Sequence, residues 1–362
     1  MNLIYNNVHL FGIDEIIYIK YFLDLISDNP SVFGGDNYVV TTFERVSKEL
    51  EKQGYHNYVY FPSNNSFDHN VINHFCAISR RVFVHAMPPI SDAIFIRNKY
   101  CKKIVWRSWG HDVGYDCSEC NFKTFKNSLR VLVEKIWARK VKKFKFVGIA
   151  NVVDYIDITR RFGKNINTVK LHYSSSPTIL TPTNTYREKE SHETINVMVG
   201  HSGHSEDNHL SIIKSLEHFG TERIHIHLVL VYGNERYITN LIESLKDIHL
   251  PYTLYTELMP LQEYNELLES MDVVVLDGKK SYALGNLSFL MKRNKKIILN
   301  REGILHQALD YLGVYHGYTD TLKEDTIEEL LYNEPVPLSA IQELGVQTRE
   351  ECIASWSKVL NS

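Results

Sequence analysis

Two side chains in the first half of the chain could act as acid or base catalysts, because they follow short apolar runs of the β-strand type. His85 ends the run 82–85, and Asp112 follows the run 104–107 after the segment Ser-Trp-Gly-His. In an open parallel sheet the carboxyl ends of the strands meet at one edge, where ligands bind. Either side chain could accept a proton there from the hydroxyl group of an acceptor. The sequence leaves open which of them is the base. It also allows a packed histidine at the strand end and an aspartate that caps the next segment.

A turn at 200–205 has the composition of an anion-binding loop. It consists of Gly-His-Ser-Gly-His-Ser and stands between the apolar run 195–199 and a predicted helix at 207–219. Glycine lets backbone N–H groups approach a ligand, and the start of a helix favours a negative charge. The turn therefore predicts a site for a phosphate or diphosphate, although an ordinary N-cap turn has a similar composition. No strand-to-helix turn carries the dinucleotide fingerprint G-x-G-x-x-G, so we expect no nicotinamide cofactor.

Other strand ends in the second half supply residues that would complete this site. The segment 282–287 precedes an apolar helix and could offer further backbone N–H groups to a diphosphate. Arg301 could neutralise phosphate and Glu302 could bind ribose or sugar hydroxyls, or both could form surface ion pairs. Tyr232 and Met259 could flank a nucleobase or simply pack. The residues that we expect to bind the donor are Gly200, His201, Ser202, Gly203, Tyr232, Met259, Ser281, Gly285, Asn286, Asn300, Arg301 and Glu302.

Metal and cofactor chemistry is not expected from the sequence. The five cysteines are an odd number without a regular framework, which fits a reducing compartment. Cys117 and Cys120 form half of a zinc pattern, but no second pair follows at a suitable spacing. Asp154 and Asp157 lie on a predicted helix, so they do not form a strand-end D-x-D metal motif. We therefore predict neither a metal ion nor a cofactor.

The elements that must position these residues alternate as in two Rossmann-like domains. The first series of predicted strands is 3–8, 38–42, 58–61, 82–85, 104–107, 144–149 and 168–171, with helices near 15–26, 43–53, 91–98, 121–142 and 151–161. The second series is 195–199, 224–231, 252–255, 273–276 and 296–299, with helices at 207–219, 235–247, 261–270 and 285–293. A segment rich in Ser, Thr and Pro separates the two series. We predict an acceptor-binding domain at 1–173, a linker at 174–192, a donor-binding domain at 193–335 and, at 336–362, a C-terminal helix (339–360) that returns toward the first domain.

The predicted helix near 121–142 is amphipathic and strongly basic. The segment 121–146 carries nine lysines and arginines against the single acid Glu134, and its apolar residues recur at helical spacing. Such a helix is typical of a surface that binds anionic lipid. It is equally compatible with an ordinary helix whose basic face is solvated.

Length and composition exclude several classes of protein. The 362 residues suggest two domains, and 44% hydrophobic with 23% charged residues is typical of a soluble globular chain. A net charge of −3 argues against nucleic acid as a partner. No run approaches the roughly 18–20 apolar residues of a membrane span, and the first residues lack the features of a signal peptide. We expect a cytoplasmic protein whose membrane contact is peripheral, on the inner face of the cell membrane.

The order of elements over 257–300 resembles the donor domain of GT-B glycosyltransferases. A strand and loop lead to a helix that ends with an acid before the strand 273–276, and a glycine-containing helix start precedes the strand 296–299. The resemblance implies an α/β fold of the GT-B type, with two Rossmann-like domains whose parallel sheets face a cleft. Phe289 stands where many retaining members carry a glutamate, so we do not expect ribose recognition by that glutamate.

Four blocks of sequence are similar to one bacterial family of such enzymes. They are Phe83-Val84-His85, the segment 105–112, Val199-Gly200-His201-Ser202-Gly203 followed by Asn208-His209, and the segment 298–302. They resemble the 4-alpha-L-fucosyltransferase family, which transfers N-acetylfucosamine from a dTDP-sugar to an undecaprenyl-linked intermediate of a cell-surface polysaccharide. The resemblance implies a metal-independent hexosyltransferase that moves a deoxy- or amino-sugar from a dTDP- or UDP-sugar to a lipid-linked glycan acceptor. Trp109 and His111 would bind that acceptor.

Two other functions are compatible with the same pattern. A non-hydrolysing sugar-nucleotide epimerase would have the same two domains but would need no lipid contact, and the basic helix argues mildly against it. A non-catalytic two-domain ligand-binding protein is disfavoured by the titratable groups at strand ends and by the lack of an export signal. The sugar, the acceptor, the stereochemical outcome and the oligomeric state stay open.

Overall fold

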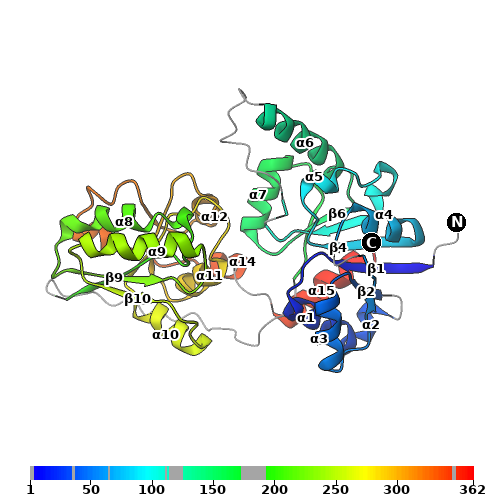
Figure 1. Cartoon of the computed structure of the whole chain (residues 1–362), viewed down its shortest axis with the longest axis horizontal. Coiled ribbons are helices and arrows are strands. Elements are labelled where there is room, and N and C mark those ends of the chain that lie inside the picture. Colours follow the sequence, from blue (N-terminus) through cyan, green and yellow to red (C-terminus); the bar gives the residue numbers. More distant parts are fainter. Residues whose placement is uncertain are drawn as a thin grey trace. The chain divides into compact units, whose positions relative to one another are not determined.

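The computed structural model describes residues 4–34, 37–63, 66–110, 112–113, 125–172, 193–344 and 348–362. The chain divides into two compact units (Figure 1): unit 1 comprises Met1–Thr178 with Val346–Ser362, and unit 2 comprises Ile179–Gly345. The predicted linker 174–192, His111 and the Cys117/Cys120 pair lie outside the described residues. None of the described helices combines the length and the apolar character that a bilayer-spanning segment needs.

Unit 1 is built around a parallel sheet. Seven described strands pair in the order β3-β2-β1-β4-β5-β6-β7. They are β1 (Tyr5–Phe11), β2 (Asn37–Thr41), β3 (Val59–Tyr60), β4 (Ser79–His85), β5 (Ile104–Arg107), β6 (Phe146–Ile149) and β7 (Thr168–Lys170). The chain order reverses at β1, which pairs with β2 on one side and β4 on the other. In such sheets ligands bind beyond the strand ends at this point.

Helices cover both faces of the unit 1 sheet. On one face Val82 and Val84 share a core with residues of α4 (His69–Ile78), α5 (Ile90–Ala93), α6 (Phe125–Val141) and α7 (Val152–Phe162). On the other face Phe11 and Phe83 share a core with residues of α1 (Ile16–Asp28), α2 (Pro30–Phe33), α3 (Glu44–Lys52) and α15 (Arg349–Leu360). Successive strand side chains point to opposite faces, so a strand covered on both sides becomes a continuous apolar run. This explains why β4 and β5 are recognisable in the sequence.

The end of the chain forms two helices where the sequence predicted one, at 339–360. The first, α14 (Leu338–Leu344), belongs to unit 2, and the second, α15, belongs to unit 1. The prediction of a single helix is wrong because α15 has its own capping box, in which Thr348 and Glu351 exchange hydrogen bonds. In α15 the fully buried Trp356 donates from Nε1 to the carbonyl oxygen of His172 at 2.7 Å.

Unit 2 repeats the same architecture. Six described strands pair in parallel in the order β10-β9-β8-β11-β12-β13. They are β8 (Ile195–Val199), β9 (Ile224–Val229), β10 (Tyr252–Tyr255), β11 (Val273–Leu276), β12 (Lys296–Leu299) and β13 (Gly317–Tyr318). The described α-helices of this unit before α14 are α8 (His209–Leu216), α9 (Glu235–Ser244), α10 (Leu261–Ser270), α11 (Leu284–Lys292), α12 (Ile304–Leu312) and α13 (Ile327–Leu331). The order reverses at β8, between β9 and β11, so the loops after β8 and β11 are the expected ligand-binding loops.

Predicted strands agree best with the structure where apolar runs are bounded by polar residues. β5, β8, β10, β11 and β12 coincide with their predicted ranges. The predictions missed α2, α4, α12, α13 and the two-residue strand β13, and the predicted helix 91–98 is wrong because α5 ends at Ala93. The N-terminus of α4 is set by Asp68, whose carboxylate accepts the N–H groups of Asn70 and Val71.

Candidate functional site

A buried carboxylate holds the turn after β8 in shape. Asp207 accepts hydrogen bonds from Ser202 Oγ at 3.0 Å and from the His201 backbone N–H at 3.3 Å, and His201 Nδ1 lies 3.2 Å from its other oxygen. Burial alone would raise the pKa of Asp207, but the hydrogen bond and charge of His201 outweigh burial and lower the pKa. The carboxylate therefore stays ionised and fixes the turn that the sequence predicted to bind anions.

Gly200 occupies a position in this turn that a side chain cannot share. Its φ is +72°, and a Cβ atom would lie 2.4 Å from Nε2 of His209. The His209 ring is buried, its Nδ1 lies 3.1 Å from the Tyr237 hydroxyl, and burial lowers its pKa to about 4. Gly203 forms a parallel bridge with Gly233 in the loop after β9. The turn is thus anchored on both sides by close backbone packing.

Asp277, which the sequence analysis did not select, connects four loops of this edge. It follows β11 and accepts hydrogen bonds from Asn208 Nδ2 at 2.6 Å, Asn300 Nδ2 at 3.0 Å and Thr319 Oγ1 at 2.5 Å. These partners belong to the loops after β8, β12 and β13. The predicted donor residue Asn300 therefore contributes through its amide to the architecture of the edge. The only signal for Asp277 in the sequence was an aspartate directly after an apolar strand.

Aromatic rings from three loops gather beside this turn. The ring centroid of His201 lies 6.4 Å from that of Tyr232 and 6.1 Å from that of Tyr282, and His204 lies 6.4 Å from Tyr232. Tyr232 is 55% exposed and Tyr282 is 39% exposed. The structure thus brings the predicted residues His201 and Tyr232 together and adds Tyr282, which the predicted site did not include.

The loop between β11 and α11 faces the turn after β8. Lys280 Nζ lies 3.3 Å from Glu206 Oε1 and 5.8 Å from the ring centroid of Tyr282. Its neighbour Ser281 is half-buried. The contact between Lys280 and Glu206 joins the two loops that flank the point where the sheet order reverses.

The start of α11 carries two more predicted residues with different surroundings. Its N-cap, Ala283, has a φ of +57°. A Cβ atom at Gly285 would meet no described atom within 4 Å, so this position borders open space. Asn286 Nδ2 donates to the Tyr264 hydroxyl at 2.6 Å, and burial raises the pKa of Tyr264 to about 12. Asn286 therefore connects α11 to α10.

Arg301 and Glu302 form the surface ion pairs that the sequence left open as an alternative. Arg301 donates from Nε and Nη2 to the two oxygens of Asp320 at 2.9 and 3.3 Å, and its guanidinium lies 3.6 Å from the ring centroid of Tyr318. Glu302 lies 2.7 Å from Lys279 Nζ. Both pairs are solvent-exposed, so they are weakly held and can exchange partners.

Met259 stands further along the same edge. It is half-buried in the loop after β10, which is two strands away from β8 in the sheet. The structure therefore does not group Met259 with the turn at 200–207.

His85 lies in the core of unit 1. Its ring is fully buried, stacks on Phe11 with centroids 4.2 Å apart, and has Nε2 at 3.1 Å from Nδ1 of His9. Burial, with added repulsion from His9 and Arg107, lowers the pKa of His85 well below its usual value. The ring is therefore neutral and packed, which is the structural role that the sequence had left open.

Asp112 is buried and fixes the loop after β5. Its carboxylate accepts hydrogen bonds from the backbone N–H groups of Met87 and Trp109 and from Trp106 Nε1, each at 2.7 Å. The loop after β5 is thereby tied to the loop after β4. The predicted acceptor residue Trp109 packs edge-on against Tyr18, with ring centroids 4.4 Å apart. The Asp112 carboxylate is thus used to fix the loops after β4 and β5.

Two exposed carboxylates lie where the unit 1 sheet reverses. Asp14 and Glu15 lie between β1 and α1 and are both exposed. Arg45 Nη2 donates to the Asp14 carboxylate at 2.9 Å and to its carbonyl oxygen at 3.1 Å, which restrains the position of Asp14. These two residues were not among the predicted site residues. Their position after the first predicted strand was the feature of the sequence that could have identified them.

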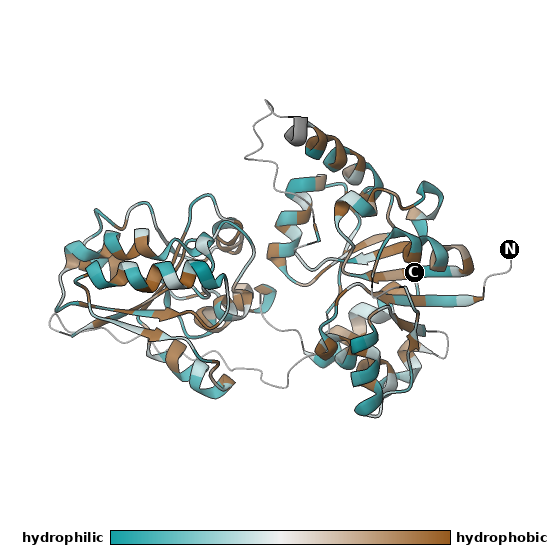
Figure 2. Ribbon diagram, in the orientation of Figure 1, coloured by the Kyte–Doolittle hydropathy of each residue, from teal (hydrophilic) through white to brown (hydrophobic). Residues whose placement is uncertain are grey.

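Helix α6 has a buried part and an exposed part. Trp137 is fully buried, and Lys140 Nζ donates to the carbonyl oxygen of Ile96 at 2.5 Å. Nearer the N-terminus, Leu129 and Leu132 are 49% and 51% exposed. Figure 2 shows apolar and polar residues alternating along this helix. The exposed basic residues beside these leucines are Arg130, Lys135 and Arg139.

Comparison with known proteins gives one family and a set of similar folds. The sequence profile of the family described as 4-alpha-L-fucosyltransferase glycosyl transferase group 56 matches residues 16–333. Among curated proteins, no match was found.

Solved structures with the same fold cover nearly the whole chain. A glycosyltransferase from Rickettsia africae has a TM-score of 0.60 and 11% identity over 99% of both chains. HepE from Anabaena, in complex with UDP and glucose, has a TM-score of 0.58 and 11% identity over 99% of this chain and 100% of HepE. WaaG, a glycosyltransferase involved in lipopolysaccharide biosynthesis, has a TM-score of 0.52 and 12% identity over 98% of both chains. The fold is that of the GT-B glycosyltransferases, as the sequence predicted.

Proposed function

The chain belongs to the 4-alpha-L-fucosyltransferase family of glycosyltransferases, group 56, and we propose that it transfers a deoxy- or amino-sugar from a dTDP- or UDP-sugar to a lipid-linked glycan. Sugar transfer from a nucleotide sugar follows from the family. The identities of the nucleotide, the sugar and the acceptor are our proposal. The complex of HepE with UDP and glucose supports a uridine or thymidine diphosphate as the nucleotide.

The pair of loops at 200–207 and 277–283 is the observation that carries the proposal. They follow β8 and β11, which are neighbours at the reversal of the sheet order. The N–H groups of Gly200, His201 and Gly203 donate to groups within the unit, so the exposed residues 204–206 are the accessible part of the first loop. The helix α11 starts directly after the second loop. The exposed rings of Tyr232 and Tyr282 offer faces on which a nucleobase can stack. A nucleoside diphosphate would thus be held with its charge at the loops and helix start, which also stabilise it as a leaving group.

We propose that an exposed carboxylate at the end of β1, Asp14 or Glu15, accepts the proton of the acceptor hydroxyl. Both side chains are exposed and stand at the reversal of the unit 1 sheet. Asp112 and His85 are buried and engaged in hydrogen bonds, which supports a positioning role for them. Trp109, in the loop that Asp112 fixes, and His111 are proposed to bind the acceptor.

The exposed part of α6 is proposed to bind the inner surface of the cell membrane. Leu129 and Leu132 are exposed together with Arg130, Lys135 and Arg139. Exposed leucines beside basic side chains match the composition of helices that lie in the interface of anionic membranes. This contact would bring the enzyme to a lipid-linked acceptor.

Thermal unfolding with nucleotides tests the donor site. A ligand that binds only the folded chain raises the melting temperature with the logarithm of its concentration above the dissociation constant. We expect millimolar dTDP or UDP to raise the melting temperature and adenosine diphosphate to raise it less. No shift with either dTDP or UDP would overturn the donor assignment.

A product assay separates the proposed transfer from the epimerase alternative. With a dTDP- or UDP-sugar and a lipid-linked acceptor, a transferase releases the nucleoside diphosphate and forms a glycosylated lipid. An epimerase would change the sugar of the nucleotide without needing the lipid, and a binding protein would leave the nucleotide sugar intact. Nucleotide release that depends on the acceptor supports transfer.

A further inference from the structure

Three potential metal ligands converge at the edge of unit 2 that carries α12 and β13. His306 and Asp310 are one helical turn apart on α12, so they share one face of the helix. His316 lies between α12 and β13, and one ligand atom from each of the three side chains lies within 4.8 Å of the others. We propose that His306, Asp310 and His316 bind a divalent transition-metal ion of the Zn²⁺ type. This departs from the sequence expectation of no metal, which rested on cysteine and D-x-D patterns.

One hydrogen bond joins the two imidazoles at the centre of the cluster. His316 Nδ1 lies 2.9 Å from the carbonyl oxygen of Val314, so Nδ1 carries the proton and Nε2 carries the lone pair. His306 Nδ1 lies 2.9 Å from that Nε2 and therefore supplies the hydrogen between the rings. The Asp310 carboxylate approaches both rings, with Oδ2 at 3.5 Å from His306 Nε2 and Oδ1 at 3.8 Å from His316 Nε2. A divalent ion would replace the hydrogen between His306 Nδ1 and His316 Nε2 and would take the Asp310 carboxylate as its third ligand.

The spacing of the donor atoms suits a transition metal. Ligands at about 2.0–2.1 Å from one ion stand roughly 2.9–3.4 Å apart for angles between 90° and tetrahedral. The nitrogens of His306 and His316 are already 2.9 Å apart, and Asp310 Oδ1 is 3.8 Å from His316 Nε2. Asp310 is 56% exposed, so its side chain can close the remaining distance by a small rotation. The carbonyl of Val314 plays the part that an outer hydrogen-bond partner plays for a metal-bound histidine.

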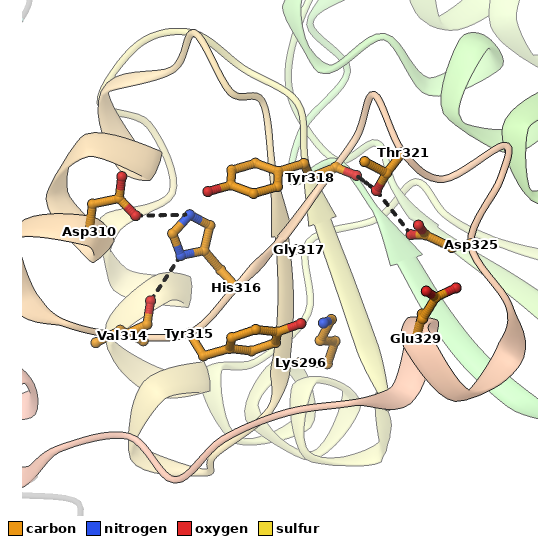
Figure 3. A pocket seen from close by; sticks show the side chains of 10 residues that line it. All are labelled: Lys296, Asp310, Val314, Tyr315, His316, Gly317, Tyr318, Thr321, Asp325 and Glu329. Atoms are coloured by element: carbon orange, nitrogen blue, oxygen red, sulfur yellow. Dashed lines mark hydrogen bonds and ion pairs between the residues drawn. The ribbon is translucent and has the colours of Figure 1, made fainter.

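The surroundings leave room for further ligands and favour positive charge. Asp310 and His316 line a cavity of about 330 Å³, in which waters could complete the coordination (Figure 3). The same cavity is lined by the carboxylates of Asp325 and Glu329 and by one ammonium group, that of Lys296. Three carboxylates against one lysine give this cavity a net negative lining.

A bound ion would fasten the last strand of the sheet. Tyr318 of β13 packs edge-on against the rings of both His306 and His316, with centroids 5.2 Å apart in each case. The Arg301 guanidinium lies 3.6 Å from the centroid of the same Tyr318 ring. The ion would therefore join α12 to β13 and stiffen the ring on which Arg301 rests.

Titration of the metal-stripped full-length chain with Zn²⁺ and Co²⁺ tests the proposal. We expect one equivalent to bind with a micromolar or lower dissociation constant and to raise the melting temperature by a few degrees. Bound Co²⁺ should give visible bands of nitrogen and oxygen ligation, without a thiolate charge-transfer band. A thiolate band would assign the ion to cysteine and overturn the proposal, as would failure of the native chain to bind either ion at 100-fold excess.

Matched variants locate the ion. Asp310→Asn changes an exposed side chain that folding tolerates, and His306→Gln and His316→Gln each remove an imidazole. Loss of an outer partner of a metal ligand costs about 10–100-fold in affinity, so loss of a ligand should cost at least about 100-fold. The control is His225→Gln, because His225 and His227 form another histidine pair in unit 2, with ring centroids 4.8 Å apart. If the single variants Asp310→Asn and His306→Gln both bind Zn²⁺ as tightly as the native chain, the three residues form only a hydrogen-bonded cluster, and the proposal is overturned.

Discussion

The two sheets of this glycosyltransferase have the same strand order at their centres but use their strand ends differently. Unit 1 has the order β2-β1-β4 where unit 2 has β9-β8-β11. After β4 and β5 of unit 1, His85 and Asp112 are buried and hydrogen-bonded inside the fold. After β8 and β9 of unit 2 the glycine turn at 200–203 is buried as well, but residues 204–206 and the ring of Tyr232 are exposed at the edge.

The comparison shows that a polar residue after a strand can have one of two roles. In unit 1 the polar groups bond to one another and to backbone, which makes a rigid edge and leaves the exposed carboxylates Asp14 and Glu15 as the reactive candidates. In unit 2 the carboxylates Asp207 and Asp277 are buried beneath the edge and hold loops in which residues 204–206 and 279–280 are exposed. A polar residue after a strand therefore identifies the edge of the sheet, and its burial decides whether it acts on a ligand or on the loop.

The largest effect is expected at the exposed carboxylates of unit 1. If one of them is the general base, Asp14→Asn or Glu15→Gln should lower kcat by about 10²–10⁴-fold, because that is the usual contribution of such a group. The melting temperature and nucleotide affinity should hardly change. Asp112→Asn, in contrast, should lower the melting temperature, because it weakens a buried set of three hydrogen bonds. If instead both surface variants keep full turnover, and Asp112→Asn is stable but inactive, then Asp112 is the general base.

The next effect concerns the glycine turn of unit 2. Gly200→Ala should weaken dTDP or UDP binding by about 100-fold, since a Cβ atom would lie 2.4 Å from the buried His209 ring and displace the turn. Gly220→Ala is the matched control, because Gly220 has a φ of +88° but no atom within 4 Å of an added Cβ. Both variants carry the strain of a positive φ, of order 1–3 kcal/mol, so thermal unfolding of Gly220→Ala measures this common loss, to which the clash adds in Gly200→Ala. Equal nucleotide binding in the two variants would remove the turn from the donor site.

The acid sensitivity of unit 1 should depend on two buried histidines of its core. Burial lowers the pKa of His9 to about 3 and that of His85 well below its usual value. Because the unfolded histidines have pKa values near 6.5, the unfolded chain binds more protons, and stability falls as pH drops from about 6.5 toward 3. Each histidine contributes about 1.4 kcal/mol per pH unit, a tenfold change in the folding equilibrium.

Tryptophan fluorescence measures this effect in unit 1 alone, because the four tryptophans of the chain all belong to it. The double variant His9→Phe with His85→Phe replaces both hydrogen-bonding partners by apolar rings, so it should fold and show a flatter dependence of melting temperature on pH. An unchanged slope between pH 7 and pH 5 would mean that these rings do not set the acid sensitivity of the unit.

How far the fold could be predicted depends on the range of the contacts involved. β8 and β11 were predicted to the residue, because a strand buried on both faces is a local apolar run. The turn at 200–205 was recognisable from its composition. Asp277 was not selected, since its partners Asn208 and Thr319 are distant in sequence.

The burial of His85 was equally hidden from the sequence. Its ring is enclosed by aromatic side chains from other segments, among them Phe22 of α1 and Trp356 of α15. The cluster around His316 was missed because β13 has only two residues and gives no strand pattern. In each case the decisive neighbour comes from an element that is far away along the chain.

The smallest effect is expected on α6, where single charges add to membrane binding. Each Lys or Arg near an anionic surface contributes about 1 kcal/mol, so Lys135→Gln should weaken binding to phosphatidylserine vesicles about fivefold at low salt. Lys48→Gln is the control, because Lys48 is exposed on α3, which covers the opposite face of the unit 1 sheet. Leu132→Ser should weaken binding as well, but without changing its salt dependence, because the leucine contributes apolar burial and no charge. Turnover with a short, water-soluble acceptor should survive all three changes, because the helix is proposed to position the enzyme and not to catalyse. If Lys135→Gln and Lys48→Gln bind vesicles equally, α6 has no special affinity for lipid, and its exposed leucines must be explained by another partner.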